Sequence, residues 1–360
     1  MIDPPLRVAL IASARYPICQ PFAGGLEAQT WMLAHGLHRR GHQVTLFAAP
    51  GTDPTLTARL LDVDRPTISL AAARDVSMPP GPWLEEHHAY LTLMLRLMQH
   101  GAEDYDVVHN NSLHYLPLAM ARSVTVPMIT TLHTPPTPWL ESAITSGPCP
   151  VTFTAVSAQT ATAWQHVVPR AHVVMNGIDL DVWRPGPGGG PLVWFGRLVS
   201  EKGPDLAIRA ARQAGLPLQL IGPISDPAFF ATRVQPLLGS GIEYLGHLPH
   251  AQLADLVGRA RATLVTPRWD EPYGLVAAES LACGTPVIGF ARGGLPEVVD
   301  QRCAILVRAD NIGALVSAAS RWASLSRAAA RDRATCRCSA DTMITAYEQL
   351  YRTLTVARAA

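Results

Sequence analysis

The chain has 360 residues, of which 48% are hydrophobic and 16% charged, with a net charge of +1. This composition fits two globular domains and excludes a disordered chain. The net charge is −3 over residues 1–180 and +4 over residues 181–360. This distribution excludes the strongly basic surface of a nucleic-acid-binding protein, but the slightly basic second half suits the binding of a small anion.

The first half alternates short apolar runs with amphipathic stretches. The apolar runs predict strands at residues 6–12, 43–48, 106–109, 127–133, 152–156 and 172–175. Helical spacing predicts helices over residues 26–40, capped by Gly41, and over residues 84–99, ending at Gly101. This alternation predicts a parallel sheet with helices on both faces.

A Pro/Gly-rich stretch at residues 184–191 interrupts the pattern and predicts a linker. The alternation then restarts, with strands expected at residues 192–195, 217–221, 242–245, 262–265, 286–290 and 304–307. Helices are expected over residues 205–214 and 228–238 and from Asn311 onward. Two doubly wound domains leave a cleft at the carboxyl ends of their strands, where ligands bind.

The sequence GRLVSEKG at residues 196–203 directly follows a predicted strand. Its glycines permit close backbone approach, Arg197 can grip two anionic oxygens, and Lys202 adds a compact charge. Paired cations beside a helix N-terminus suit a diphosphate. A solvated surface turn is the alternative, but Lys202 is the one lysine beside 28 arginines, which favours a function.

A pair of glutamates, Glu271 and Glu279, flanks the start of another predicted helix. Pro272 and Gly274 place Glu271 in the loop before the helix and Glu279 in its second turn, so both can face one ligand. The amides of Tyr273, Gly274 and Leu275 are expected to point at an anionic leaving group. Glu279 can accept hydrogen bonds from two vicinal hydroxyls, as on a ribose.

These motifs resemble those of the family 4 retaining glycosyltransferases of the GT-B fold. The spacing of Glu271 and Glu279 matches the family's paired-glutamate motif. Residues 22–27 (FAGGLE) resemble its N-terminal glycine loop, and residues 176–179 (NGID) resemble the segment before its linker. The similarity is densest over residues 195–299.

The resemblance implies an α/β GT-B fold of two doubly wound, Rossmann-like domains facing each other across a cleft. Residues 1–184 would form the acceptor-side domain and residues 185–339 the donor-binding domain, with a helix at 340–360 packing back on the first. The expected reaction moves a sugar from a nucleotide-diphosphate sugar, UDP-linked first and GDP-linked second, to an unidentified hydroxyl acceptor.

The resemblance also assigns roles to individual residues. Arg197 and Lys202 would hold the donor diphosphate, Glu279 the ribose, and Glu271 the transferred sugar. Gly24 and Gly25 would bring backbone amides towards the sugar or the diphosphate, and His133, at a predicted strand end, matches the family's active-site histidine. The implied chemistry is electrostatic, with retention of anomeric configuration and neither a metal nor a covalent nucleophile.

Competing interpretations remain at this stage. The DxD sequence Asp62-Val63-Asp64 is a metal–diphosphate signature of another glycosyltransferase architecture, although the following Arg65-Pro66 favours an ordinary turn. A non-catalytic sugar-nucleotide sensor and a sugar-nucleotide epimerase are the alternatives in function.

The expected partners are a nucleotide sugar and a small-molecule or glycan acceptor, without nucleic acid. Aromatic residues in or near first-domain loops are candidates for the acceptor side: Tyr16, Trp83, His109, His114 and Trp139. Residues 37–42 form a small basic tip with too few arginines to indicate membrane docking. Six scattered cysteines suggest neither zinc nor disulfides. The chain lacks both a recognisable signal peptide and an apolar run of membrane-spanning length, and this favours a cytoplasmic protein.

Overall fold

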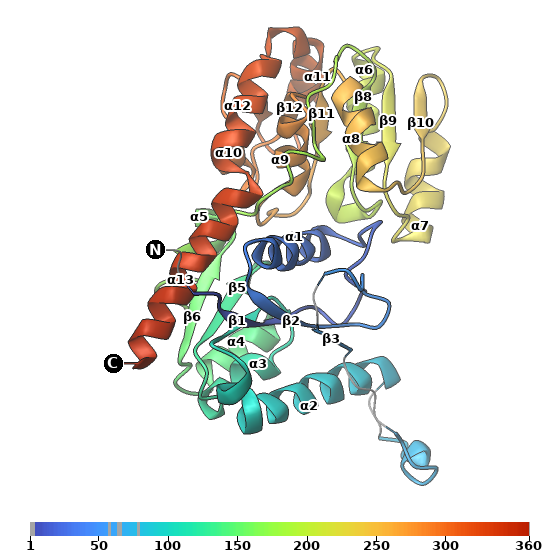
Figure 1. Cartoon of the computed structure of the whole chain (residues 1–360). Coiled ribbons are helices and arrows are strands. Elements are labelled where there is room, and N and C mark those ends of the chain that lie inside the picture. The colour runs from blue at the N-terminus through green and yellow to red at the C-terminus, as the bar shows by residue number, and fades with distance from the viewer. Residues whose placement is uncertain (1–3, 57–58, 63–66, 78–79, 360) are drawn as a thin grey trace.

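A computed structural model describes residues 4–56, 59–62, 67–77 and 80–359. It contains a seven-stranded and a six-stranded sheet, and each is wholly parallel (Figure 1). The strand order is β3-β2-β1-β4-β5-β6-β7 in the first sheet and β10-β9-β8-β11-β12-β13 in the second. This is the predicted α/β GT-B arrangement of two doubly wound domains.

The elements of the first domain are β1 (Arg7–Ile11), α1 (Gly25–Arg39), β2 (Gln43–Ala48), β3 (Arg59–Asp62), α2 (Gly81–Asp104), β4 (Val107–Asn110), α3 (Leu116–Ala119), β5 (Met128–Leu132), α4 (Pro138–Thr145), β6 (Val151–Ala155), α5 (Ala158–Trp164) and β7 (His172–Val173). Successive side chains of β1 point to opposite faces of its sheet. Val8 and Leu10 pack with α1, whereas Ala9 and Ile11 pack with α2. As a result, α1 lies between the first sheet and the second domain (Figure 1).

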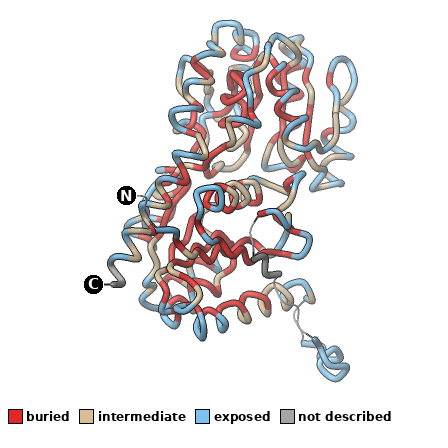
Figure 2. Tube along the Cα trace, in the orientation of Figure 1, coloured by how far each residue is buried: buried red, intermediate tan, exposed pale blue. Residues whose placement is uncertain are grey.

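The elements of the second domain are β8 (Leu192–Phe195), α6 (Pro204–Gln213), β9 (Leu218–Ile221), α7 (Pro227–Phe229), β10 (Ile242–Tyr244), α8 (His250–Arg259), β11 (Thr263–Val265), α9 (Leu275–Ala282), β12 (Val287–Phe290), α10 (Leu295–Val298), β13 (Ala304–Val307), α11 (Ile312–Ser320) and α12 (Arg327–Arg337). The inner strands of both sheets, such as β4, β5, β8 and β12, form the buried interior (Figure 2).

The C-terminal helix α13 (Ala340–Ala359) leaves the second domain and packs on α1 and the first sheet (Figure 1). Arg40 binds Asp341 at 2.9 Å and also Glu348, and His42 Nε2 lies 2.7 Å from Glu348. In the expected basic tip at residues 37–42, α13 thus supplies carboxylate partners to Arg40 and His42, while His38 and Arg39 are exposed.

The chain crosses between the domains twice, and the two crossings are bonded to each other. Ile178 N–H donates to Cys338 C=O at 2.8 Å, and Ala340 N–H donates to Ile178 C=O at 2.9 Å. Trp183 already packs in the core of the second domain. The stretch at residues 184–191 is fixed to that domain, with Gly188 N–H donating to Gly258 C=O at 3.0 Å.

Several predicted elements differ from the structure. The stretch at residues 228–238 is α7 followed by a π-turn and a 3-10 turn, because Pro236 lacks the N–H that a continuous helix requires. Helix α2 continues through Gly101, which is buried within contact distance of Val126. Asp62 ends strand β3, whereas Val63, Asp64 and the turn expected at Arg65-Pro66 lie outside the described residues. Helix α8 had not been predicted.

Candidate functional site

A cavity of about 380 Å³ lies between the two domains. It is lined by every residue that the sequence singled out for the site. The first domain contributes Gly24, Gly25 and His133, and the second contributes Arg197, Lys202, Glu271, Tyr273, Gly274, Leu275 and Glu279. Residues far apart in sequence meet here because they follow the carboxyl ends of strands in two facing sheets.

The Lys202 turn is held against the neighbouring strand end. Gly203 has φ +66°, and a Cβ there would lie 2.1 Å from Thr266 C=O, so the turn requires glycine. Arg268 donates to Ser200 C=O at 2.7 Å and forms a bidentate pair with the buried Asp205 at 2.7 and 2.8 Å. These contacts fix where the Lys202 backbone enters the cavity.

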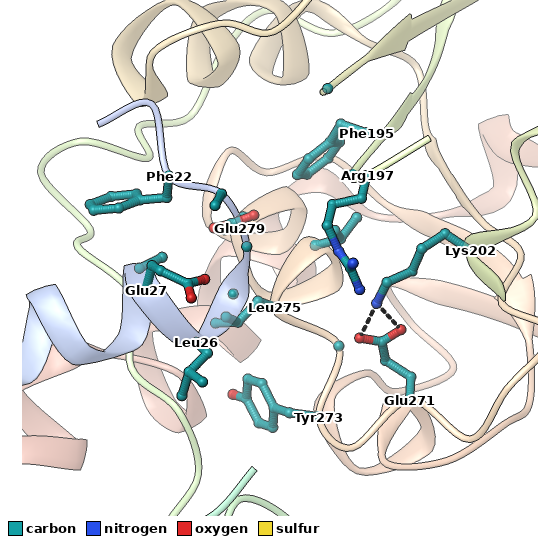
Figure 3. A pocket seen from close by; sticks show the side chains of 18 of the residues that line it. Phe22, Leu26, Glu27, Phe195, Arg197, Lys202, Glu271, Tyr273, Leu275 and Glu279 are labelled. Carbon is teal, nitrogen blue, oxygen red and sulfur yellow. Dashed lines mark hydrogen bonds and ion pairs between the residues drawn. The ribbon is translucent and has the colours of Figure 1, made fainter. Parts of the chain in front are cut away.

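Lys202 and Glu271 form an ion pair inside the cavity. Lys202 Nζ donates to the two Glu271 carboxylate oxygens at 2.6 and 2.7 Å (Figure 3). Trp269 Nε1–H donates to Glu271 at 3.1 Å. Lys202 Nζ also lies 5.0 Å from the Trp269 ring centroid. Arg197 extends beside this pair, and its guanidinium donates to the exposed Glu201 at 3.0 Å. Two cations therefore converge at one wall, and sequence reasoning missed Trp269, which contacts both Lys202 and Glu271.

The N-terminus of α9 opens onto the same cavity. Gly274 precedes the helix with φ +100°, and the N–H groups of Leu275 and Val276 have no partner among the described residues. Gly294 N–H donates to Glu271 C=O at 2.7 Å, and a Cβ on Gly293 would lie 2.1 Å from the same oxygen. The glycine pair thus permits the close approach that sets the loop. Tyr273 lines the cavity, and its side chain is buried.

Glu279 presents a buried carboxyl to the cavity. The residue is 8% exposed, and its carboxyl has no hydrogen-bond partner among the described residues. Burial raises the pKa of this carboxyl to about 8. A buried oxygen pair of this kind can accept hydrogen bonds from ligand hydroxyls.

The buried Glu279 predicts a pH dependence of stability. Its pKa is about 8 in the folded protein, against an ordinary value of 4.5. The unfolded chain therefore releases this proton first, and the group lowers the free energy of unfolding as the pH rises between about 5 and 8. In urea denaturation, Glu279→Gln should lose less stability than the wild type over this range. An identical pH dependence of the two proteins would contradict this assignment.

The first-domain wall begins with the glycine loop before α1. A Cβ on Gly25 would lie 2.8 Å from Leu275 Cδ1, so glycine allows the starts of α1 and α9 to meet across the cavity. Glu27, in the first turn of α1, is 5% exposed, and burial raises the pKa of its carboxyl while the Arg197 charge opposes this rise. Figure 3 shows Glu27 on α1, across from Arg197. The sequence motif contained Glu27, but no role was drawn from it.

His133 follows β5 and is half-buried at the cavity wall. Its Nε2 lies 3.0 Å from Asn111 Oδ1, and burial lowers the pKa of the ring to about 3, so the imidazole is neutral at pH 7.

Of the aromatic candidates, Tyr16 lines the cavity. His109 is a structural residue, fully buried between Tyr351 and Thr131 at 2.6 and 2.7 Å, so its expectation as an acceptor-side group is wrong.

The other three candidates form part of one stack of rings. Ring centroids are 5.1 Å apart for Trp83 and His87, 4.7 Å for His114 and Tyr115, and 5.5 Å for Tyr115 and Trp139. Tyr115 OH also lies 3.0 Å from His87 Nδ1. Trp83 and Trp139 are 38% and 60% exposed. None of these rings is among the residues that line the cavity, although Leu113, which directly precedes His114, does line it.

Two family models together match most of the chain. The model described as Glycosyltransferase Family 4 matches residues 23–182, and the one described as Glycosyl transferases group 1 matches residues 190–335. The D-inositol 3-phosphate glycosyltransferase of Mycobacterium tuberculosis is 30% identical over 92% of this chain and 80% of its own length. The chain belongs to glycosyltransferase family 4.

Solved structures share the fold of this glycosyltransferase. Sucrose-phosphate synthase from Thermosynechococcus elongatus superposes with a TM-score of 0.76 at 22% identity, covering 97% of this chain and 99% of that one. Anabaena Alr3699/HepE, solved in complex with UDP-glucose, gives 0.75 at 16% identity, covering 97% and 100%.

Neither a metal cluster nor a membrane-spanning helix is found among the described residues of this glycosyltransferase. In the part of the chain that the structure describes, no three His, Cys, Asp or Glu side chains are grouped to hold a metal ion. Across the same ranges, no helix has both the length and the apolar character needed to cross a bilayer.

Proposed function

We propose that this glycosyltransferase takes its sugar from a nucleotide-diphosphate sugar and transfers it without a metal ion and with retention of anomeric configuration. The observation that carries this proposal is the convergence of Arg197, Lys202 and the free N–H groups of α9 at one cavity. Cations and helix N-terminal amides stabilise a diphosphate. The carboxyl of Glu279 beside them suits the two ribose hydroxyls.

The chemistry follows from charge development. Breaking the bond between the anomeric carbon and the phosphate oxygen leaves negative charge on the departing diphosphate, which Arg197, Lys202 and the helix amides stabilise. Both Glu271 oxygens accept hydrogen bonds from Lys202, so this carboxylate is poorly suited as a nucleophile. Retention then requires attack from the face that the diphosphate leaves, with a leaving-group oxygen taking the acceptor proton.

A UDP-sugar is the first choice of donor and a GDP-sugar the second. The Anabaena structure that shares this fold is described as a complex with UDP-glucose, which supports the first choice.

For the acceptor we favour a neutral, polyhydroxylated molecule. Among the described first-domain residues that line the cavity, Arg15 carries the one fixed positive charge, and it lies 3.6 Å from Glu86. The stack from Trp83 to Trp139, whose two tryptophans are partly exposed, offers ring faces to the apolar C–H face of a sugar. The curated relative is named for an inositol phosphate; this wall suits an uncharged acceptor better.

The test is a donor and acceptor panel. Thermal shifts with nucleoside diphosphates identify the base, and the matching sugar nucleotides are then incubated with neutral glycosides or sugar phosphates in excess EDTA. We expect transfer to a neutral acceptor, with retained configuration by NMR. Loss of turnover in EDTA restored by manganese would exclude the metal-free mechanism. Isomerised donor formed without any acceptor would indicate an epimerase instead.

A further inference from the structure

Two buried residues, Asn111 and Gln29, connect His133 to Met343 of helix α13. His133 Nε2 lies 3.0 Å from Asn111 Oδ1, Asn111 Nδ2 donates to Gln29 Oε1 at 3.2 Å, and Gln29 Nε2 donates to Met343 Sδ at 3.7 Å. Asn111, Gln29 and Met343 are 0%, 1% and 2% exposed. The series therefore runs from the cavity wall through α1 to α13 without access to water.

The sulfur gives this series a direction. A thioether accepts hydrogen bonds but cannot donate one. The amide of Gln29 therefore faces Met343 with its NH2 group and Asn111 with its oxygen. Asn111 must then donate to Gln29, which leaves its own Oδ1 towards His133. The reverse arrangement would set Gln29 Oε1 against the sulfur with no proton between them, which is unfavourable in a buried site.

The position of the sulfur is itself fixed. Gly177 N–H donates to Met343 Sδ at 3.0 Å. A Cβ on Gly177 would lie 2.6 Å from Ala340 Cα, so the two backbones are in close contact at this crossing between the domains. The Met343 end of the series is thus held in place by a backbone N–H group.

We propose that Met343, Gln29 and Asn111 are positioning residues that hold His133 as its Nε2–H tautomer, so that Nδ1 offers a lone pair to a substrate hydroxyl. This role rests on the proposed function, which makes the cavity a sugar-binding site. Nδ1 has no partner among the described residues. The low pKa of His133 agrees with a neutral ring.

The tautomer has a consequence for recognition. A ring nitrogen with a lone pair accepts from a sugar hydroxyl and repels an anionic oxygen. His133 would therefore favour the sugar at its end of the cavity and keep the diphosphate at the Arg197 and Lys202 end.

The test reads the tautomer directly by ¹⁵N NMR of full-length protein labelled at histidine, without substrate. The ¹⁵N signals that disappear in the His133→Gln variant are assigned to His133. We expect the Nε2–H pattern at pH 7 in the wild type. Gln29→Met removes the amide and frees Asn111 to turn, so we expect a shift towards Nδ1–H and a kcat about tenfold lower, with little change in donor KM.

Tyr351→Phe is the matched control, because it removes a hydrogen bond between α13 and His109 without touching the series. It should leave the His133 tautomer unchanged. A charged or Nδ1–H His133 in the wild type would overturn the proposal, even if Gln29→Met does not fold. An unchanged tautomer in folded Gln29→Met would overturn it too. Absence of sugar transfer would instead refute the proposed function, since the tautomer is read without turnover.

Discussion

Replacing Lys202 by alanine is expected to lower kcat/KM for sugar transfer about 100- to 1000-fold, the usual effect of removing one group that stabilises developing charge. Lys202 is positioned by both Glu271 oxygens and by the face of Trp269. The alanine variant lacks the positive charge that stabilises the departing diphosphate. It also leaves the Glu271 carboxylate beside the diphosphate without its Lys202 partner. Steady-state kinetics with the matching donor measures the effect.

Arginine is not expected to rescue this position. A guanidinium is planar and longer than an ammonium, so Lys202→Arg cannot keep both the Glu271 contacts and the place over Trp269. The control is Arg259→Ala, which removes one positive charge from an exposed pair with Asp255. Near-normal kinetics in Lys202→Arg would show that the single lysine of this arginine-rich chain has no special role.

Replacing Arg268 by alanine is expected to lower the free energy of unfolding by about 3 kcal/mol, near the lower end of the range for breaking buried ion pairs. Asp205 is 1% exposed in its side chain, and Arg268 is 30% exposed. The variant leaves the Asp205 carboxylate buried without its cation and removes a donor from Ser200 C=O. Urea denaturation measures the loss, and kcat/KM should fall as well, because the Lys202 turn loses a support.

Arg259→Ala serves as the control again. Its ion pair with Asp255 joins side chains that are 63% and 58% exposed, so its loss should change stability by less than about 1 kcal/mol. If both variants lose the same stability, the Asp205 pair is no better than a surface contact.

The local sequence pattern was sufficient to predict many of the strands and helices. Strands β2, β8 and β13 have the predicted bounds of residues 43–48, 192–195 and 304–307, because buried parallel strands give compact apolar runs. Tertiary packing decided the exceptions. Gly101 remains helical because it packs near Val126, and the short strand β3 pairs with β2 although it carries little pattern of its own.

The candidate site was likewise predictable where local sequence pattern decides the structure and not where tertiary packing does. Motifs that follow predicted strands could be placed at one cleft, since the carboxyl ends of parallel strands share an edge. The residues that contact and position these motif residues could not be predicted from the sequence. Asn111 and Gln29 are 82 residues apart, and Gln29 and Met343 are 314 apart. The packing of α1 on the first sheet brings Gln29 to Asn111, and the return of α13 onto α1 brings Met343 to Gln29. No sequence spacing encodes either contact.

The paired crossings of the two domains limit how the cavity can open. Ile178 is bonded on both sides to the returning chain at Cys338 and Ala340, so the two connections meet at one point and act as a single pivot. For any rotation of one domain about this pivot, the displacement grows with distance from it. The part of the cavity rim farthest from the crossings would therefore move the most.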